Sequence, residues 1–205
     1  MKRQPSDSGL QPAKPEVVLA SSSVNRRALL GRLIDGFQVC EPTGGEPVLE
    51  GECARGRALR LSRFKAVSAK TAYPAHLIIG SDQVAECAGR LLHKPLAAEG
   101  AMADLQWASG RVIHFWTGLV VLDTRTGTEY AAVDHTRVWM RELSAAEIAR
   151  YLAADAPWSC AASFRAESRG PSLWRCLSTR DPSALIGLPL IRLAQFLREA
   201  GYPVP

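Results

Sequence analysis

One apolar run followed by polar side chains most constrains how this chain can fold. Leu77–Ile79 predicts a buried strand, and Gly80 would then let the backbone carry Asp82 and Gln83 into open space at the strand end. Lys94 follows later in the sequence, directly before Pro95. A carboxylate and an ammonium at the edge of a sheet could hold a metal ion and a phosphate. A strand that ends in a solvated turn is an equally simple interpretation of this segment alone.

The rest of the chain alternates strand and helix patterns, which indicates the α/β class. A long hairpin in the middle predicts a mixed rather than a purely parallel sheet. The 205 residues, 47% of them hydrophobic, can bury a full core. We predict a disordered tail over residues 1–15 and a single domain over residues 16–205. Strands are expected at 16–20, 37–41, 77–86, 90–93, 111–123, 128–141 and 173–177, and helices after the cap Ser23 and at 53–70, 97–108, 144–153 and 182–200.

Composition excludes several classes of protein. The five cysteines form no C-x-x-C pair and the four histidines show no ligand spacing, which argues against a disulfide framework or a zinc site. No apolar run approaches the roughly 18 residues of a membrane span, and the amino terminus lacks a secretory apolar region. We therefore expect a cytoplasmic protein without a membrane partner. The net charge of +5 suits an anionic ligand. Aromatic and basic residues do not interleave, so no nucleic-acid partner is expected.

The turn after the first strand is a candidate anion site. Ser21 and Ser23 lead into Arg26 and Arg27 at a helix amino terminus, where free N–H groups, hydroxyls and guanidinium groups would meet. A capped helix with two solvated arginines is the simpler alternative. Further charged residues near predicted element ends favour the anion site: Lys65, Asp82 and Lys94.

In their order and spacing, these residues resemble the Maf-like protein family. The likeness runs from about Val17 to Gly201. The Ser-Asp-Gln form at Asp82 and Gln83, with Cys160 and Glu167, resembles the branch that acts on 7-methyl-guanosine triphosphate. The matching motifs are Leu19–Arg27, Lys65-Ala66, Gly80–Val84, Lys94-Pro95, Ala108–Gly110, Thr117-Gly118, Leu143–Ile148 with Tyr151, and Ile186–Leu190.

The resemblance implies a nucleoside triphosphate pyrophosphatase, which hydrolyses the bond between the α and β phosphates to give a monophosphate and pyrophosphate. It implies a long twisted mixed sheet with surrounding helices, forming two lobes and a deep cleft. The partner would be a small-molecule nucleotide, and a homodimer is possible.

The resemblance also assigns roles to the charged residues. Asp82 would be the catalytic base, and Asp82 with Glu46 would hold Mg²⁺ or Mn²⁺ through hard oxygen ligands. The phosphate-binding residues would be Ser21, Ser23, Arg26, Arg27, Lys65 and Lys94.

Three residues would select the base. Glu167 could accept hydrogen bonds from N1–H and N2–H of a guanine, and Gln83 marks the branch. A tryptophan usually precedes the two arginines in this branch, where it could stack on the cationic methylated base. This chain has Asn25 instead. We therefore expect a preference for the methylated base that is real but reduced.

Other departures from the family pattern concern loops. Gly44 and Gly45 replace a Val-Asp pair before Glu46, and Ala162 and Ser168 replace glycines. If glycine takes a positive φ at those two places, Ala162 and Ser168 would strain the loop or shift it. None of these changes removes a cation or Asp82, so activity is expected to persist.

Two alternatives stay open. A nucleotide-binding regulatory protein of cell division with little turnover would share the same fold. A pyrophosphatase for UTP or dTTP would share the chemistry. Retention of both Asp82 and Glu46 favours an enzyme over a pure binder, and Gln83 in place of a threonine argues against a pyrimidine substrate.

Overall fold

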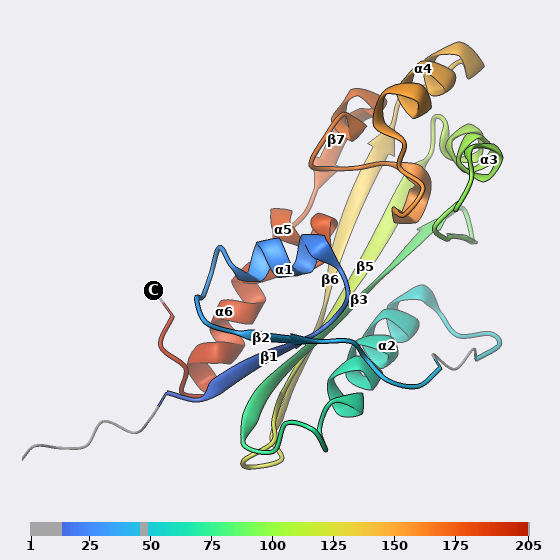
Figure 1. The fold of residues 1–205 in the computed structure, drawn as a ribbon. Coiled ribbons are helices and arrows are strands. Elements are labelled where there is room, and N and C mark those ends of the chain that lie inside the picture. Colours follow the sequence, from blue (N-terminus) through green and yellow to red (C-terminus); the bar gives the residue numbers. More distant parts are fainter. Residues whose placement is uncertain (1–13, 46–48, 205) are drawn as a thin grey trace, which may run out of the picture.

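The structure, a computed structural model, describes residues 14–45 and 49–204 as strands and helices in alternation (Figure 1). Most elements form close to where the sequence predicts them. The strands are β1 (Glu16–Ala20), β2 (Gln38–Cys40), β3 (His76–Cys87), β4 (Arg90–Leu92), β5 (Val112–Asp123), β6 (Glu129–Met140) and β7 (Trp174–Ser178). The helices are α1 (Val24–Leu30), α2 (Ala54–Ser68), α3 (Ala98–Ala108), α4 (Ala145–Asp155), α5 (Pro182–Ile186) and α6 (Leu190–Glu199), with 3₁₀ turns η1 (Ala161–Ser163) and η2 (Gly170–Leu173).

All seven strands belong to one mixed sheet. Six follow the order β2-β1-β3-β5-β6-β7, and β4 pairs with the end of β3. β1 runs parallel to β2 and β3, whereas β3, β5, β6 and β7 pair antiparallel in sequence. Helices surround this sheet (Figure 1). The predicted α/β class with a mixed sheet is confirmed.

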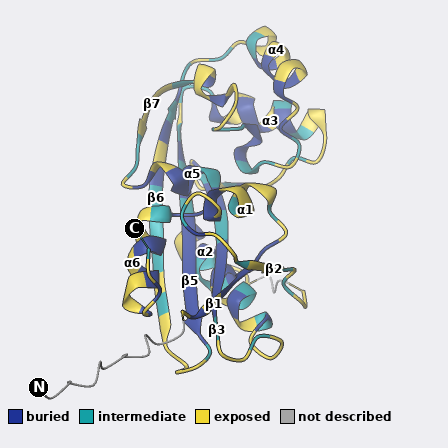
Figure 2. Ribbon diagram, turned by 60° about the vertical axis from the view of Figure 1, so that its left-hand side comes forward, coloured by how far each residue is buried: buried dark blue, intermediate teal, exposed yellow. Residues whose placement is uncertain are grey.

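The buried side chains gather at the two ends of the long strands. At one end, β1, β3 and β5 pack against α1 and α6 on one face and against α2 on the other. At the other end, the same long strands pack against α3, α4 and η1. Figure 2 shows β5 buried along most of its length, whereas β6 is largely half-buried or exposed. The long strands therefore connect two clusters, and the region between them is available for a site.

The strand expected over residues 77–86 forms as β3 (His76–Cys87). The expectation that Asp82 and Gln83 lie at a strand end is wrong, because both lie in the middle of β3. Gly80 does not form a turn. A Cβ atom there would overlap the backbone of Ser62 and Ala66 in α2. The glycine is needed because α2 lies directly on the sheet.

The predicted helix over residues 182–200 is wrong, because the structure has two helices there. Gly187 takes φ 121° after α5, a conformation that other residues rarely adopt, and the Pro189 ring cannot continue the hydrogen-bond pattern. The N–H of Ile191 donates to Asp181 Oδ2 at 2.7 Å, which satisfies a free donor at the start of α6. This break places the loop between α5 and α6 beside α1.

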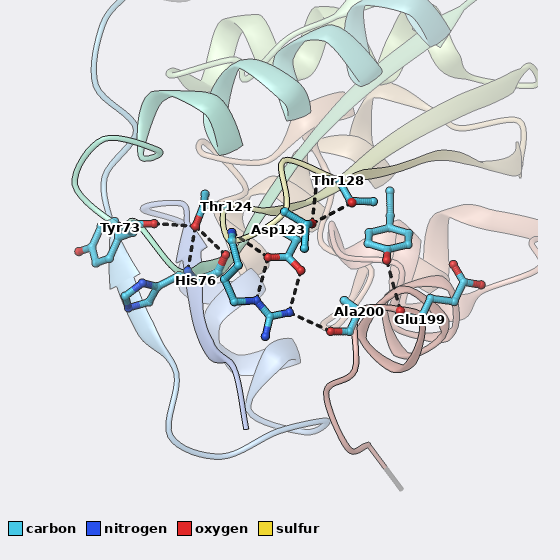
Figure 3. A network of polar contacts seen from close by, with 10 residues as sticks. Tyr73, His76, Asp123, Thr124, Thr128, Glu199 and Ala200 are labelled. Carbon is cyan, nitrogen blue, oxygen red and sulfur yellow. Dashed lines mark hydrogen bonds and ion pairs between the residues drawn. The ribbon is translucent and has the colours of Figure 1, made fainter. Parts of the chain in front are cut away.

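A polar network fixes the turn between β5 and β6 (Figure 3). Arg125 donates to both oxygens of Asp123, from Nε at 2.9 Å and from Nη2 at 2.7 Å, and Nη2 also reaches the carbonyl of Ala200 at 3.1 Å. Thr124 donates to the carbonyls of Tyr73 and His76. The side-chain hydrogen bonds from Arg125 hold the pKa of Asp123 below its usual value. The network ties the hairpin to the end of α6 and to the loop before β3.

None of the helices within residues 14–45 and 49–204 is both long and apolar enough to cross a membrane.

Candidate functional site

A cavity of about 610 Å³ lies between the two ends of the fold. Its wall combines the start of α1, the last turn of α2, the middle of β3, the segment after β4, residues 159–167 and the end of α5. Most residues that the sequence analysis assigned to a site line this cavity: Ser21, Ser23, Asn25, Arg26, Lys65, Asp82, Gln83, Lys94 and Glu167. Arg27 is exposed and is not part of this wall. Glu46 lies outside the described residues.

The start of α1 presents hydroxyl groups to the cavity. Ser23 caps the helix, and its Oγ accepts from the N–H of Arg26 at 3.3 Å. Ser21 Oγ accepts from the N–H of Ser23 at 3.1 Å. Because both hydroxyls act as acceptors here, their hydrogens can be donated to an anion in the cavity.

Arg26 is fixed by the loop between α5 and α6. Its Nε donates to the carbonyl of Gly187 at 2.8 Å. Ser81 Oγ donates to the same carbonyl at 3.0 Å. The Gly187 carbonyl thus joins β3, α1 and the end of α5, which explains why the break between the two last helices matters for the site.

Asp82 is held by two groups of α2. Lys65 Nζ lies 2.5 Å from Asp82 Oδ1, and the side chains of Lys65 and Asp82 are 13% and 14% exposed. The N–H of Asp82 donates to Ser62 Oγ at 2.8 Å, and Ser62 is fully buried. The second carboxylate oxygen, Oδ2, makes no hydrogen bond to another described residue. Asp82 therefore keeps one acceptor for a ligand.

The sequence analysis missed Ser62. It contacts Asp82 because the helix packs on the strand where Gly80 and Gly118 lack side chains. A Cβ atom at Gly118 would overlap the carbonyl of Ala58. No local pattern marks a serine on the inner face of a helix as a partner of a strand residue 20 positions away. The two strand glycines are the signal that could have indicated such a close approach.

Gln83 has its amide nitrogen fully engaged. Nε2 donates to Thr117 Oγ1 at 3.1 Å and to the carbonyls of Ala184 and Leu185 at 2.9 and 3.1 Å. The amide group has two N–H donors, so none is left for a ligand. Gln83 can therefore contribute only its oxygen, as an acceptor.

Asn25 and Glu167 meet at the rim of the cavity. Asn25 Nδ2 donates to Glu167 Oε1 at 2.8 Å, although 142 positions separate the two residues, and both are exposed. The contact links the start of α1 to the segment after η1. It leaves Glu167 Oε2 to accept from a ligand.

Aromatic faces that the sequence analysis did not assign also line the cavity. Phe64, Phe115 and Phe164 come from α2, β5 and the segment after η1. Phe115 and Phe164 are 2% and 4% exposed, so they form a rigid apolar wall. None of the motifs named in the sequence analysis includes these three aromatic residues.

The segment that carries Glu167 is strained near η1. Ala162 takes φ 58° and Ser163 takes φ 60°, values that favour glycine. The positive φ considered for Ala162 is therefore present. Ser168 does not have a positive φ. Of the two loop glycines, Gly44 has φ 92° and Gly45 does not lie in this region.

The donor set fits a divalent cation that is shared with a ligand. Among the described residues, no group of three or more His, Cys, Asp or Glu side chains could hold a metal ion. Asp82 offers one open carboxylate oxygen beside Lys65. Mg²⁺ is commonly bound by one or two carboxylates together with substrate phosphates and water. The site therefore suits that mode of binding rather than a cage made by the protein alone.

Comparisons with known proteins identify the family of this chain. Residues 16–200 match the family described as Maf-like protein, so the chain belongs to the Maf family. A protein of Nitrosococcus oceani named 7-methyl-GTP pyrophosphatase is 43% identical to this chain over 193 residues, which are 94% of this chain and 97% of that relative. The family that the sequence motifs indicated is confirmed.

Proposed function

We propose that this protein is a nucleoside triphosphate pyrophosphatase that acts on 7-methyl-GTP, giving 7-methyl-GMP and pyrophosphate. Membership of the Maf family and the near full-length relative named 7-methyl-GTP pyrophosphatase support the reaction and the substrate. The observation that carries the proposal is the arrangement around Asp82. One of its oxygens is held by Lys65, and the other is open in a cavity that also contains Arg26 and Lys94.

The charges of the cavity suit a triphosphate. Arg26, Lys65 and Lys94 supply cations, and the hydroxyls of Ser21 and Ser23 supply hydrogen-bond donors. Fixed donors stabilise the negative charge that develops on the leaving pyrophosphate without having to reorganise. Binding and catalysis thus draw on the same groups.

Asp82 is the proposed general base. Its Oδ2 accepts a proton from water as the water oxygen attacks the α-phosphorus, and the bond from that phosphorus to the pyrophosphate oxygen breaks. Lys65 orients Asp82 through its contact with Oδ1. A Mg²⁺ or Mn²⁺ ion, held by Asp82, by the predicted ligand Glu46 and by phosphate oxygens, would lower the pKa of water and neutralise phosphate charge.

Base recognition is assigned to the rim and the apolar wall. Glu167 Oε2 and Gln83 Oε1 are acceptors, which match the N1–H and N2–H donors of a guanine. Both amide hydrogens of Gln83 are committed to protein acceptors, which favours a base that donates to Gln83. Phe64 provides an aromatic face on the cavity wall.

The test is a panel of nucleotides with identification of the products. We expect metal-dependent release of pyrophosphate and a monophosphate, fastest with 7-methyl-GTP, then GTP, then UTP and dTTP. Orthophosphate and a diphosphate as products would overturn cleavage between the α and β phosphates. A full rate in excess chelator would overturn the metal requirement. Binding of all nucleotides without turnover would favour the regulatory alternative.

The identity of the metal, the oligomeric state and the cellular location are part of the same proposal. Mg²⁺ and Mn²⁺ should be compared as activators. The homodimer and the cytoplasmic location stay predictions, and sedimentation of the purified chain tests the first of them.

A further inference from the structure

A second cavity, of about 380 Å³, lies beyond α5. Its wall comes from β6, the connection between β7 and α5, and the start of α6. Asp134 belongs to this wall and lies in one cross-strand row with Thr117 and Gln83. Thr117 and Gln83 both donate to the carbonyl of Ala184 in α5. Gln83 lines the first cavity and Asp134 lines the second.

A buried carboxylate oxygen in this cavity has no partner. Asp134 Oδ1 is inaccessible to solvent and makes no hydrogen bond within the described part of the chain. Burial, with a further contribution from the charge of Asp181, raises the pKa of Asp134. A buried polar atom without a partner costs stability. The second oxygen of this carboxylate, Oδ2, is not enclosed in the same way, and no described residue donates to it either.

Arginine side chains line the same cavity but form no ion pair with this carboxylate. Arg137, Arg180 and Arg192 belong to the wall, and no ion pair among the described residues joins any of them to Asp134. Arg192 Nη1 donates to the neutral Gln195 Oε1 at 2.8 Å. Ser178 belongs to the same wall, whereas the hydroxyl of Thr179 donates to the carbonyl of Asp181 at 2.9 Å. The cavity thus combines several donors for an anion with one acceptor that lacks a donor.

We propose that the second cavity binds a phosphorylated small molecule of about the size of a nucleoside monophosphate. Arg180 and Arg192 hold its phosphate, and the other oxygen of Asp134, Oδ2, which is not enclosed, accepts a hydrogen bond from a hydroxyl or N–H group elsewhere on the same molecule. Ligand pockets commonly measure roughly 300–1,000 Å³. A bare phosphate would leave much of this cavity unfilled, whereas a nucleoside monophosphate also supplies hydroxyl and N–H donors. This site is independent of the proposed reaction in the first cavity.

The test is a titration of the full-length protein, labelled with ¹⁵N, with GMP and in parallel with orthophosphate. We expect GMP to shift the backbone amides of residues 132–135 and 178–180, apart from any shifts at residues 21–26 in the first cavity. Signals at the two cavities are read separately, so a failure of the proposed reaction does not decide this result. Shifts confined to the first cavity would overturn the second site.

Variants identify the groups involved. Arg180→Ala with Arg192→Ala should weaken GMP binding at residues 178–180 by at least about tenfold, because two charge-assisted contacts are lost. Arg150→Ala with Arg175→Ala removes the same charge from exposed positions outside both cavities and should leave that affinity unchanged. If both double variants weaken GMP binding equally, the effect comes from the net charge of the protein, and the proposed site is wrong. Circular dichroism and thermal unfolding confirm that each variant is folded, and Arg180→Gln replaces any variant that is not.

The role of Asp134 is tested by Asp134→Leu, which removes the unpartnered acceptor. GMP should then lose its advantage over orthophosphate at residues 178–180. Orthophosphate could bind the unmodified protein as tightly as GMP and produce the same shifts. In that case the site binds the phosphate group alone, and the proposed hydrogen bond from the ligand to Asp134 is wrong.

Discussion

Two carboxylates on strands β3 and β5 show how a site differs from a structural contact. Asp123 and Asp82 each face a cation, Arg125 and Lys65, at hydrogen-bonding distance. Asp123 has both oxygens bound by Arg125, whose guanidinium also reaches the carbonyl of Ala200 (Figure 3). Asp82 has one oxygen bound and the other open to the cavity.

Backbone strain occurs near both carboxylates. The segment that lines part of the cavity holds Ala162 and Ser163 at positive φ. The turn after Asp123 uses Gly127, at φ 78°. However, Ala75, in the loop before β3 that the hairpin network contacts, takes φ 72°. The two regions therefore differ in how many carboxylate oxygens are bound and not in the strain of the backbone.

The largest expected effect is that of Asp82→Asn. Turnover should fall on the order of 10²–10⁴-fold, because the amide cannot accept a proton. The free energy of unfolding should change little in comparison. Pyrophosphate release and urea unfolding measure the two quantities. A rate within about threefold of the parent would reject the assigned role.

Asp123→Asn should show the reverse pattern. The free energy of unfolding should fall by roughly 1–3 kcal/mol, because a buried charged acceptor of two hydrogen bonds is lost while Arg125 remains. Turnover per folded molecule should stay close to that of the parent. Urea unfolding and the nucleotide assay on the same sample check both statements. A loss of activity without a loss of stability would contradict the comparison.

Acid should weaken the hairpin contact in a defined direction. The pKa of Asp123 is lowered in the folded state from an ordinary value of 3.8. Its contribution to stability is therefore present above about 3.8 and is lost as the pH falls through the lower folded pKa. The difference in stability between the parent and Asp123→Asn should narrow at the acid end of a series of urea unfolding curves. An equal difference at neutral pH and at the lowest pH would contradict this.

The capping box of α4 gives a second acid-sensitive contact. The backbone and side chain of Ser144, followed by Arg141, lower the pKa of Glu147 from 4.5 to about 2. The contribution of Glu147 to the free energy of unfolding should be present above pH 4.5 and should disappear as the pH falls towards about 2. Glu147→Gln should flatten that part of the profile of stability against pH. Glu99→Gln, in the first turn of α3, is the matched control because α3 has no side-chain cap.

The smallest effect tests the strain at the cavity wall. Ala162→Gly should raise the free energy of unfolding by up to about 1 kcal/mol, because glycine adopts φ 58° without the cost that a Cβ atom brings. Ala161→Gly is the matched control, since Ala161 does not have a positive φ and glycine should destabilise the protein there. If both changes destabilise equally, the strain at Ala162 is not significant.

Contacts between neighbours in the sequence were predictable. The helix expected from residue 144 begins with a capping box between Ser144 and Glu147. Hairpins join the strands expected at 77–86 and 90–93 and those expected at 111–123 and 128–141. These features depend on residues a few positions apart, so the sequence contains both partners in one window.

Contacts between distant residues were not predictable in this way. The helix expected over residues 182–200 breaks at Gly187, whose carbonyl then binds Arg26 and Ser81. Arg27 follows Arg26 in the same motif, yet the turn of the helix leaves Arg27 exposed outside the cavity wall. The motif contains both arginines. Only the direction of each side chain in the folded protein shows that Arg26 lines the cavity and Arg27 does not.

By itself, the sequence determined the family, the α/β class and most of the residues that line the cavity. It did so because strand and helix periodicity, caps and ordered motifs are local properties of the chain. Only the tertiary structure decided which atoms of those residues are available. Asp82 keeps one open oxygen, Gln83 keeps only an acceptor, and Asn25 holds Glu167, because each is bound by a group 17 or more positions away. The first two pairings arise from the packing of α2 and α5 on the sheet, and the third arises where the start of α1 meets the segment after η1.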